Sequence, residues 1–301
     1  MRTSTGLFLI VRVLTISLGF SSLSLAAEAP ATTAANQSVS RVQSLGELEF
    51  VEVNTPSQSG QPKQLIIYVH GTPGSLGAFL SYMNDPLLQD KYHMISVTRP
   101  GWVNEDDVKV PLLEKQAEAL EPLLRKDQSG LGAILMGHSF GGPVIAKTAM
   151  QYPNLVAGLA FIASTGDPEL SGPRWYNRFA VIIPELLLGS DLKGANAEIM
   201  PLRPQLEEML PLWETLEIPV LIVQGDEDRL VNPRNADFLV SSLVNAEVTY
   251  LQRQGLGHFV LWEDKDLIRQ AMLEVFDQQT AELVCEDATG QVAPADVATL
   301  C

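Results

Sequence analysis

The stretch Gly-His-Ser-Phe-Gly-Gly at residues 137–142 decides the fold, because it joins an apolar strand-like run, 133–136, to a helix-like run. At a sharp turn between strand and helix, the serine of a Gly-x-Ser-x-Gly pattern takes a strained backbone conformation that exposes its hydroxyl above the sheet. Gly137 and Gly141 avoid clashes between strand and helix, and the helix N-terminus favours developing negative charge. Ser139 is therefore the candidate nucleophile. The alternative is a glycine-rich turn in which Ser139 only caps the helix.

A serine is a poor nucleophile unless a base removes its proton, and the chain has four histidines. His138 adjoins the serine and would point away from it at a tight turn. His93 opens a predicted buried strand, where a histidine satisfied within the core or at an edge is expected. His70 belongs to a separate motif. His258 lies in the glycine-loosened loop 255–259, before the last predicted helix, and is the predicted base.

The base needs a carboxylate that fixes its tautomer and stabilises the imidazolium. The apolar run 219–223 leads into a turn with three acids, Asp226, Glu227 and Asp228, any of which could serve. Asp228 is the predicted acid, because the carboxylate must clear the strand end and curl toward the loop of His258. Asp226 and Glu227 are expected to cap or solvate the turn.

A tetrahedral intermediate also needs backbone donors for its oxyanion. One is expected from the amide of Phe140, next to the nucleophile. The other is expected from the loop His-Gly-Thr-Pro-Gly at 70–74, which directly follows an apolar strand-like run. Gly71 lets amides of this loop face the site, and the Thr72 amide is the predicted donor. His70 is expected to brace the loop.

Near-continuous apolar runs separated by helix-like stretches predict an α/β fold with a mostly parallel sheet covered on both faces. The run 47–53 alternates better and is predicted to be an antiparallel edge strand. The near-continuous runs lie at 65–69, 93–97, 133–136, 156–162 and 219–223.

Three helical regions are predicted. Residues 111–126 read as an amphipathic helix that bends or ends near Pro122, and residues 261–278 as the last strong helix. Between 165 and 213 the strand pattern stops and proline-interrupted helical segments appear, which predicts an inserted helical cap. Its apolar side chains, from Trp175 to Leu188, are expected to pack the cap on the core or to line a hydrophobic pocket.

The order of these motifs resembles the α/β-hydrolase superfamily from about residue 47 to residue 280. His-Gly-x-Pro-Gly comes early, Gly-His-Ser-Phe-Gly-Gly in the middle, Gly-Asp-x-Asp-x-x-Val late and Gly-x-Gly-His near the end. The resemblance implies an eight-stranded sheet, a helical cap (165–213) after the sixth strand, and neither a metal nor a cofactor. The core would then comprise 42–164 and 214–284.

Matched residue by residue, the superfamily's nucleophile falls on Ser139, its acid on Asp228, its base on His258 and its oxyanion donors on Thr72 and Phe140.

One segment departs from the superfamily pattern. Members commonly show an acidic residue before an arginine and Gly-x-Ser after it, whereas residues 98–104 read Thr-Arg-Pro-Gly-Trp-Val-Asn. A reshaped loop is expected after this strand.

The N-terminal residues of the chain point to export. Residues 1–26 combine two arginines, an apolar run and small residues at the end, which indicates a cleaved signal peptide, followed by a flexible leader at 27–41. The protein is expected to be periplasmic or secreted; an uncleaved membrane anchor is the alternative. The tail 285–301 holds Cys285 and Cys301, either a disulfide in an oxidising compartment or two free thiols.

The composition and charge of the chain limit the classes of partner that it can bind. The chain of 301 residues has 46% hydrophobic and 19% charged residues, which is globular, and a net charge of -16. A surface this acidic repels phosphate backbones and anionic lipid headgroups, so no nucleic-acid partner is expected. Stable membrane insertion after removal of the signal peptide is not expected either.

The predicted substrate is a small-molecule ester or related acyl compound, cleaved through an acyl-enzyme. An aminopeptidase or amidase of the proline iminopeptidase type is an alternative, since those enzymes share His-Gly-x-Pro-Gly but typically have glycine in place of Thr72. Acyl transfer to an alcohol would use the same groups. A non-catalytic ligand receptor on the same fold is the alternative from another class.

Overall fold

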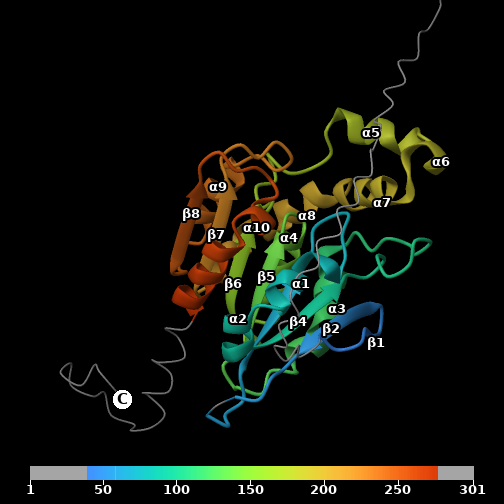
Figure 1. Cartoon of the computed structure of the whole chain (residues 1–301). Coiled ribbons are helices and arrows are strands. Elements are labelled where there is room, and N and C mark those ends of the chain that lie inside the picture. The colour runs from blue at the N-terminus through green and yellow to red at the C-terminus, as the bar shows by residue number, and fades with distance from the viewer. Residues whose placement is uncertain (1–38, 58, 277–301) are drawn as a thin grey trace, which may run out of the picture. The chain divides into compact units, whose positions relative to one another are not determined.

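The computed structural model describes residues 39–57 and 59–276, and its centre is one eight-stranded sheet (Figure 1). The strands lie in the order β1-β2-β4-β3-β5-β6-β7-β8. Strands β3 to β8 pair in parallel, whereas β1 pairs antiparallel with β2, and β2 with β4. The predicted α/β class with a mostly parallel sheet is confirmed. The strands are β1 (Gln43–Leu45), β2 (Leu48–Val53), β3 (Gln64–Val69), β4 (Tyr92–Thr98), β5 (Ala133–His138), β6 (Val156–Ile162), β7 (Val220–Gly225) and β8 (Val248–Arg253).

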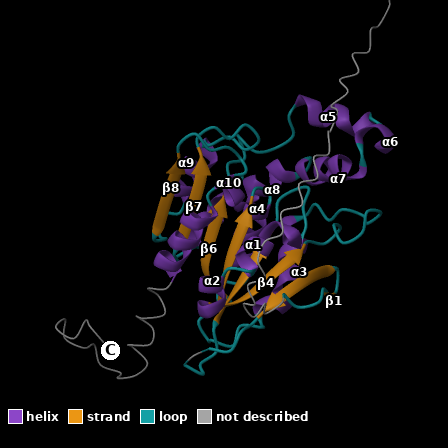
Figure 2. Ribbon diagram, viewed as in Figure 1, coloured by secondary structure: helices purple, strands orange, loops and turns teal. Residues whose placement is uncertain are grey.

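Apolar cores lie on both faces of the sheet, because side chains of a strand point alternately to opposite faces. In β3, Leu65 and Ile67 join one core while Ile66 and Tyr68 join the other. This two-sided burial explains why the strand reads as a continuous apolar run. Figure 2 shows helices flanking the sheet. The first core is completed by three helices: α3 (Leu113–Leu124), α4 (Gly141–Gln151) and α9 (Arg234–Ser242). The second core is completed by η1 (Leu76–Phe79), α1 (Leu80–Met83), α2 (Pro86–Lys91), α10 (Val260–Glu263) and residues 265–276.

The run predicted as an antiparallel edge strand is β2, which is antiparallel but not at the edge. The three-residue strand β1 lies outside it. Residues Gln43 and Ser44 of β1 are exposed, so this strand has no apolar pattern that the sequence could reveal. The other predicted strands agree with the observed ones to within two residues at each end.

Two helices end differently from a simple reading of the sequence. Helix α3 continues through Pro122 and ends at Leu124, since Leu123 and Leu124 are buried against the core. The last predicted helix, 261–278, is instead two helices within the described residues. The break lies at Asp264, whose φ of -126° and ψ of 37° are not helical.

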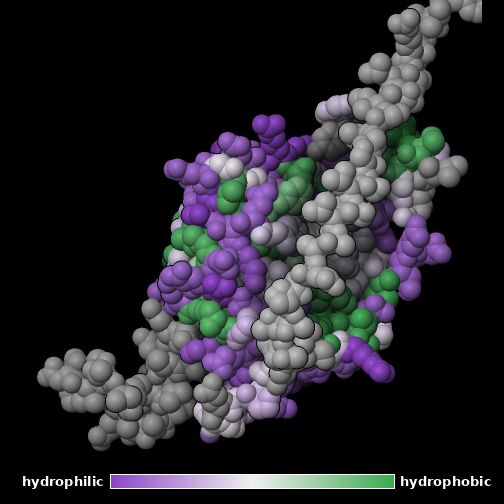
Figure 3. All heavy atoms as spheres, in the orientation of Figure 1, coloured by the Kyte–Doolittle hydropathy of each residue, from purple (hydrophilic) through white to green (hydrophobic). Residues whose placement is uncertain are grey.

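Four α-helices are inserted between β6 and β7: α5 (Trp175–Ile182), α6 (Glu185–Leu188), α7 (Ser190–Ile199) and α8 (Leu202–Met209), followed by the 3₁₀ helix η2 (Leu210–Thr215). Helix α8 and η2 pack on the core through Leu206 and Trp213, which are buried. Helix α5 does not. Trp175 and Ile182, spaced two helical turns apart, are about three-quarters exposed (73% and 75%), and hydrophobic surface gathers over this region in Figure 3. For Trp175 and Ile182, the expectation of packing on the core is therefore wrong.

Several sequence predictions lie outside the described residues: the signal peptide at 1–26, all but the last three residues of the leader at 27–41, and the tail with its two cysteines. Within residues 39–57 and 59–276, no helix is long and apolar enough to cross a membrane. The same residues contain no cluster of three or more side chains suited to hold a metal ion.

The end of β7 packs so closely on the loop 253–259 that only glycine fits at position 225. A Cβ at Gly225 would lie 2.6 Å from the carbonyl oxygen of Gly257 and closer still to that of Leu256. Since both obstacles are backbone atoms, we predict that Gly225→Ala lowers the free energy of unfolding by about 1–3 kcal/mol in urea denaturation.

The matched control is Gly257→Ala, whose added methyl would meet no atom closer than 3.9 Å. It is expected to change the free energy of unfolding by less than about 1 kcal/mol. Equal losses in the two variants would contradict the packing argument.

Candidate active site

Ser139 lies in the turn between β5 and α4 with a positive φ of 55°, a conformation that is uncommon for residues other than glycine. Its amide donates to the carbonyl of Ile162 at 3.0 Å, which ties the turn to the neighbouring strand β6. Glycine is required on both sides. A Cβ at Gly137 would lie 2.5 Å from the carbonyl oxygen of Gly141, and one at Gly141 would clash with the carbonyls of Val69 and His70.

His258 and Asp228 form a hydrogen-bonded pair in the loops that follow β8 and β7. His258 Nδ1 donates to Asp228 Oδ2 at 2.8 Å, and the two residues are only 8% and 6% exposed. Because Nδ1 carries the proton in this bond, the neutral ring presents Nε2 as its basic nitrogen. Ser139 Oγ and His258 share no hydrogen bond in the described structure, and such catalytic bonds often tighten only when substrate is bound.

The carboxylate of Asp228 is fully hydrogen-bonded. Its Oδ1 accepts from the amides of Leu230 at 2.8 Å and Val231 at 2.9 Å, and Oδ2 also accepts from Gln224 Nε2 at 3.1 Å. Burial alone would raise the pKa of Asp228, but the bond to His258 and the two amides outweigh it and lower the pKa below its usual value. The group is thus held ionised, as the partner of a transient imidazolium must be.

His138 supports the loop of His258 and does not act as a base. Its Nε2 donates to the carbonyl oxygen of His258 at 3.1 Å, and the two rings lie 4.8 Å apart between centroids. Burial, with the nearby His258, lowers the pKa of His138 to about 3, so the ring stays neutral at ordinary pH.

The loop after β3 lies directly beside the serine. A Cβ at Gly71 would be 2.9 Å from Ser139 Cβ. Within the described residues, neither the Thr72 amide nor the Phe140 amide donates to a protein acceptor. The structure thus places the loop that carries the Thr72 amide beside the turn that carries Ser139 and the Phe140 amide.

Asp226, His93 and His70, which were also singled out in the sequence, have structural partners. Asp226 accepts from the amide of Gly255 at 2.8 Å, which joins the acid turn to the histidine loop. His93 bonds to Glu52 at 2.7 Å across β4 and β2. His70 braces the loop that it opens, through its own Nδ1 and the carbonyl of Gly71, 2.6 Å apart.

A profile described as the alpha/beta hydrolase family matches residues 66–271, about two thirds of the chain. The chain belongs to the alpha/beta hydrolase family.

Known relatives of this α/β hydrolase are hydrolases too. The 2-hydroxy-6-oxononadienedioate/2-hydroxy-6-oxononatrienedioate hydrolase of Escherichia coli K12 is 26% identical over 286 residues, which cover 81% of this chain and 96% of the relative. Among solved structures, Cfl2 of Burkholderia cenocepacia has a TM-score of 0.61 at 21% identity, covering 78% of this chain and 95% of its own. A thermophilic esterase of Thermogutta terrifontis has a TM-score of 0.61 at 17% identity, and the match covers 77% of this chain and 93% of the esterase. At these identities the structural likeness shows the fold alone.

Sequence reasoning missed Glu198 and gave no role to Arg99 of this α/β hydrolase. Both side chains are completely buried and joined to each other at 2.6 Å. The available signal was an arginine directly after a buried strand, in the segment that departs from the superfamily pattern. Glu198 gave no signal, since it lies 99 residues further along the chain.

The low pKa of His138 makes this α/β hydrolase sensitive to acid. Between pH 6.5, the ordinary histidine value, and pH 3, the unfolded chain binds a proton at this residue that the folded chain does not. Stability is therefore lost as pH falls through this window. In His138→Gln the side-chain amide retains a hydrogen-bond donor but does not titrate. We predict that the free energy of unfolding of this variant falls by about 3 kcal/mol less than that of wild type between pH 7 and pH 4.5.

Urea denaturation at the two pH values measures the free energy of unfolding of each protein. The change between pH 7 and pH 4.5 is taken for each protein separately, and the two changes are then compared. An unchanged pH dependence in His138→Gln would mean that the histidine is not held neutral by the fold.

Proposed function

We propose that this α/β hydrolase is a serine hydrolase that cleaves a carboxylic ester through an acyl-enzyme. The observation that carries the proposal is the buried hydrogen bond from His258 to Asp228, which leaves Nε2 as the basic nitrogen. The strained turn at Ser139, with the unpaired amides of Thr72 and Phe140 beside it, supports the same chemistry.

In the first step, Ser139 Oγ attacks the ester carbonyl while His258 Nε2 takes the hydroxyl proton. The imidazolium so formed is stabilised by Asp228, whose charge is maintained by its amide donors. The carbonyl oxygen becomes an oxyanion. Hydrogen bonds from two preorganised amides stabilise this charge much more strongly in a site that excludes water than they would in water.

Collapse of the intermediate expels the alcohol, which takes its proton from His258, and leaves the acyl group on Ser139. A water molecule then gives its proton to Nε2 and attacks the acyl carbonyl, so that the acid leaves and Ser139 is restored. Each proton that His258 accepts is returned, and the cycle closes without any further reactant.

The ester class is favoured over the amide class by position 72. Thr72 stands where proline iminopeptidases, which share the His-Gly-x-Pro-Gly pattern, typically have glycine. A substrate panel separates the candidates: short p-nitrophenyl esters for an esterase, aminoacyl-naphthylamides for an aminopeptidase, and 2-hydroxy-6-oxononadienedioate for the activity by which the Escherichia coli relative is known. Transfer to an added alcohol would reveal an acyltransferase.

The triad assignment predicts that Asp228→Asn lowers kcat for the preferred ester by about 10⁴-fold, because an amide stabilises the wrong imidazole tautomer. Ser139→Ala should remain folded, lose turnover and lose labelling by a fluorophosphonate probe.

The matched control is Asp226→Asn, two residues away in the same turn. The carboxylate of Asp226 is exposed and, within the described structure, accepts only from the amide of Gly255, so this variant should keep kcat within about threefold of wild type. Labelling of Ser139→Ala as fast as wild type would end the proposal.

A further inference from the structure

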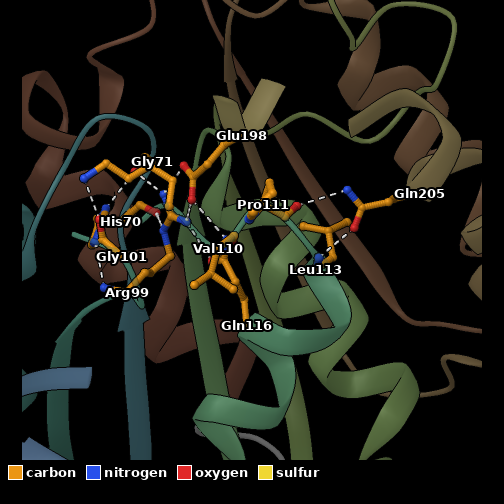
Figure 4. Close-up of polar contacts among 11 residues, drawn as sticks. His70, Gly71, Arg99, Gly101, Val110, Pro111, Leu113, Gln116, Glu198 and Gln205 are labelled. Atoms are coloured by element: carbon orange, nitrogen blue, oxygen red, sulfur yellow. Dashed lines mark hydrogen bonds and ion pairs between the residues drawn. The ribbon is translucent and has the colours of Figure 1, made fainter. Parts of the chain in front are cut away.

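Arg99 directly follows β4 and is completely buried, with every one of its five side-chain N–H donors bound (Figure 4). Nε donates to the carbonyl of His70 at 3.0 Å, and Nη2 to the carbonyl of Gly71 at 2.8 Å. Nη1 donates to Gln116 Oε1 at 2.7 Å. The remaining two donors form a bidentate pair with Glu198, at 2.6 Å and 3.0 Å.

The bond to Gly71 acts directly on the predicted oxyanion donor. The carbonyl of Gly71 and the amide of Thr72 belong to one planar, trans peptide unit, in which C=O and N–H point in opposite directions. Whatever holds this carbonyl therefore fixes the direction of the Thr72 N–H. Arg99 holds it from the side opposite to the amide.

Arg99 also contacts the residue that carries the second donor. Its guanidinium carbon lies 4.9 Å from the centroid of the Phe140 ring, a cation–π contact in a buried setting. One guanidinium thus supports both expected donors, Thr72 through its peptide unit and Phe140 through its ring.

His70 reinforces the same peptide unit. The backbone amide of Arg99 donates to His70 Nε2 at 3.0 Å, so the proton of the neutral ring sits on Nδ1, which donates to the carbonyl of Gly71 at 2.6 Å. Burial, and then the charge of Arg99, lower the pKa of His70 well below its usual value, which keeps the ring neutral, and the two hydrogen bonds fix its tautomer.

Glu198 comes from α7, a helix of the insert between β6 and β7, and it supplies the only charge that directly neutralises Arg99 within the described residues. Its Oε1 also accepts from Gln116 Nε2 at 3.1 Å. A second polar link joins the insert to the same region of the core, since Gln205 of α8 accepts from the amide of Leu113 at 2.7 Å and donates to the carbonyl of Pro111 at 3.0 Å. The insert is thereby bound to the peptide that carries the Thr72 amide.

We propose that Arg99 is a positioning residue for the oxyanion hole, and that Glu198 makes its hold depend on the docking of α7. The inserted helices then govern how well the transition state is stabilised, and not only how substrate is bound. This inference rests on the ester-hydrolase function proposed above and adds to it a coupling between the insert and the reacting carbonyl.

The double variant Arg99→Met/Glu198→Leu tests the proposal. Replacing both members of a buried pair with apolar side chains is often tolerated by the fold, whereas removing one member leaves a charge buried alone. With the guanidinium bonds to the carbonyls of His70 and Gly71 removed, only His70 Nδ1 still holds the Gly71 carbonyl, and we expect kcat to fall by about 10- to 100-fold while KM changes by less than about threefold. The inhibition constant of a trifluoromethyl ketone, which forms a tetrahedral oxyanion on the serine, should rise by the same factor as kcat/KM falls.

A second variant, Arg99→Lys, guards against misfolding of the first. Lysine keeps the charge beside Glu198 but presents a compact ammonium that cannot reproduce the five-donor fork, so the same loss of kcat is expected. The matched control is Arg203→Met/Glu207→Leu, which replaces an exposed ion pair on α8 of the same insert. This variant should leave kcat and the inhibition constant of the ketone unchanged.

The outcomes separate this inference from the function on which it rests. If wild type is active and Ser139→Ala is not, while folded Arg99 variants keep the wild-type kcat and ketone affinity, the positioning role is overturned alone. A rise in KM without a loss of kcat would overturn it equally, because it would assign the pair to ground-state binding. If wild type neither hydrolyses esters nor reacts with the ketone, the proposed function fails and the inference with it.

Discussion

The close approach of the Ser139 turn to the end of β3 is the constraint on which the rest of the site depends. Strands β3 and β5 are parallel neighbours, so the loops that follow them leave the sheet at the same edge. Glycine at 71 and 141 lets these loops come together without intervening side chains, since a Cβ at either position would meet the other loop. The loop that carries Thr72 lies beside the Ser139 turn for this reason.

Asp228 and His258 reach the same edge independently, in the loops that follow β7 and β8. These strands are also parallel neighbours, and the bonds from Asp228 to His258 and from Asp226 to the amide of Gly255 join the two loops. The glycine at 225 lets the loops pack against each other, much as the glycines at the serine turn do. His138 then links the two halves, because it adjoins the serine and bonds to the carbonyl of His258.

Much of this could be predicted from the sequence, for identifiable physical reasons. Buried parallel strands read as apolar runs because both of their faces are covered, so five of them were located closely. Elimination among only four histidines singled out His258, and its pairing with Asp228 rather than Asp226 followed from where each acid stands relative to the strand end. Strand β1 was missed because its three residues, largely exposed, carry no pattern.

Other features could not be predicted, since they depend on how side chains meet in space. The pairing of Arg99 with Glu198 joins a strand end to an inserted helix 99 residues away, and although the position of Arg99 after a buried strand is a local signal, no local pattern marks Glu198. The outward apolar face of α5 was misjudged for the same reason, because periodicity shows that a helix has an apolar face but not what that face contacts. Both features involve the insert, which is attached to the core through buried apolar side chains of α8 and η2 and through the polar contacts of Glu198 and Gln205.

The most direct test of the central claim is the crystal structure of the enzyme after reaction with a fluorophosphonate. The account predicts phosphorus bonded to Ser139 Oγ, and a phosphoryl oxygen about 2.7–3.1 Å from the amide nitrogens of both Thr72 and Phe140. His258 Nε2 should face the serine oxygen. A phosphoryl oxygen turned away from both amides, or an adduct on any other residue, would contradict the account.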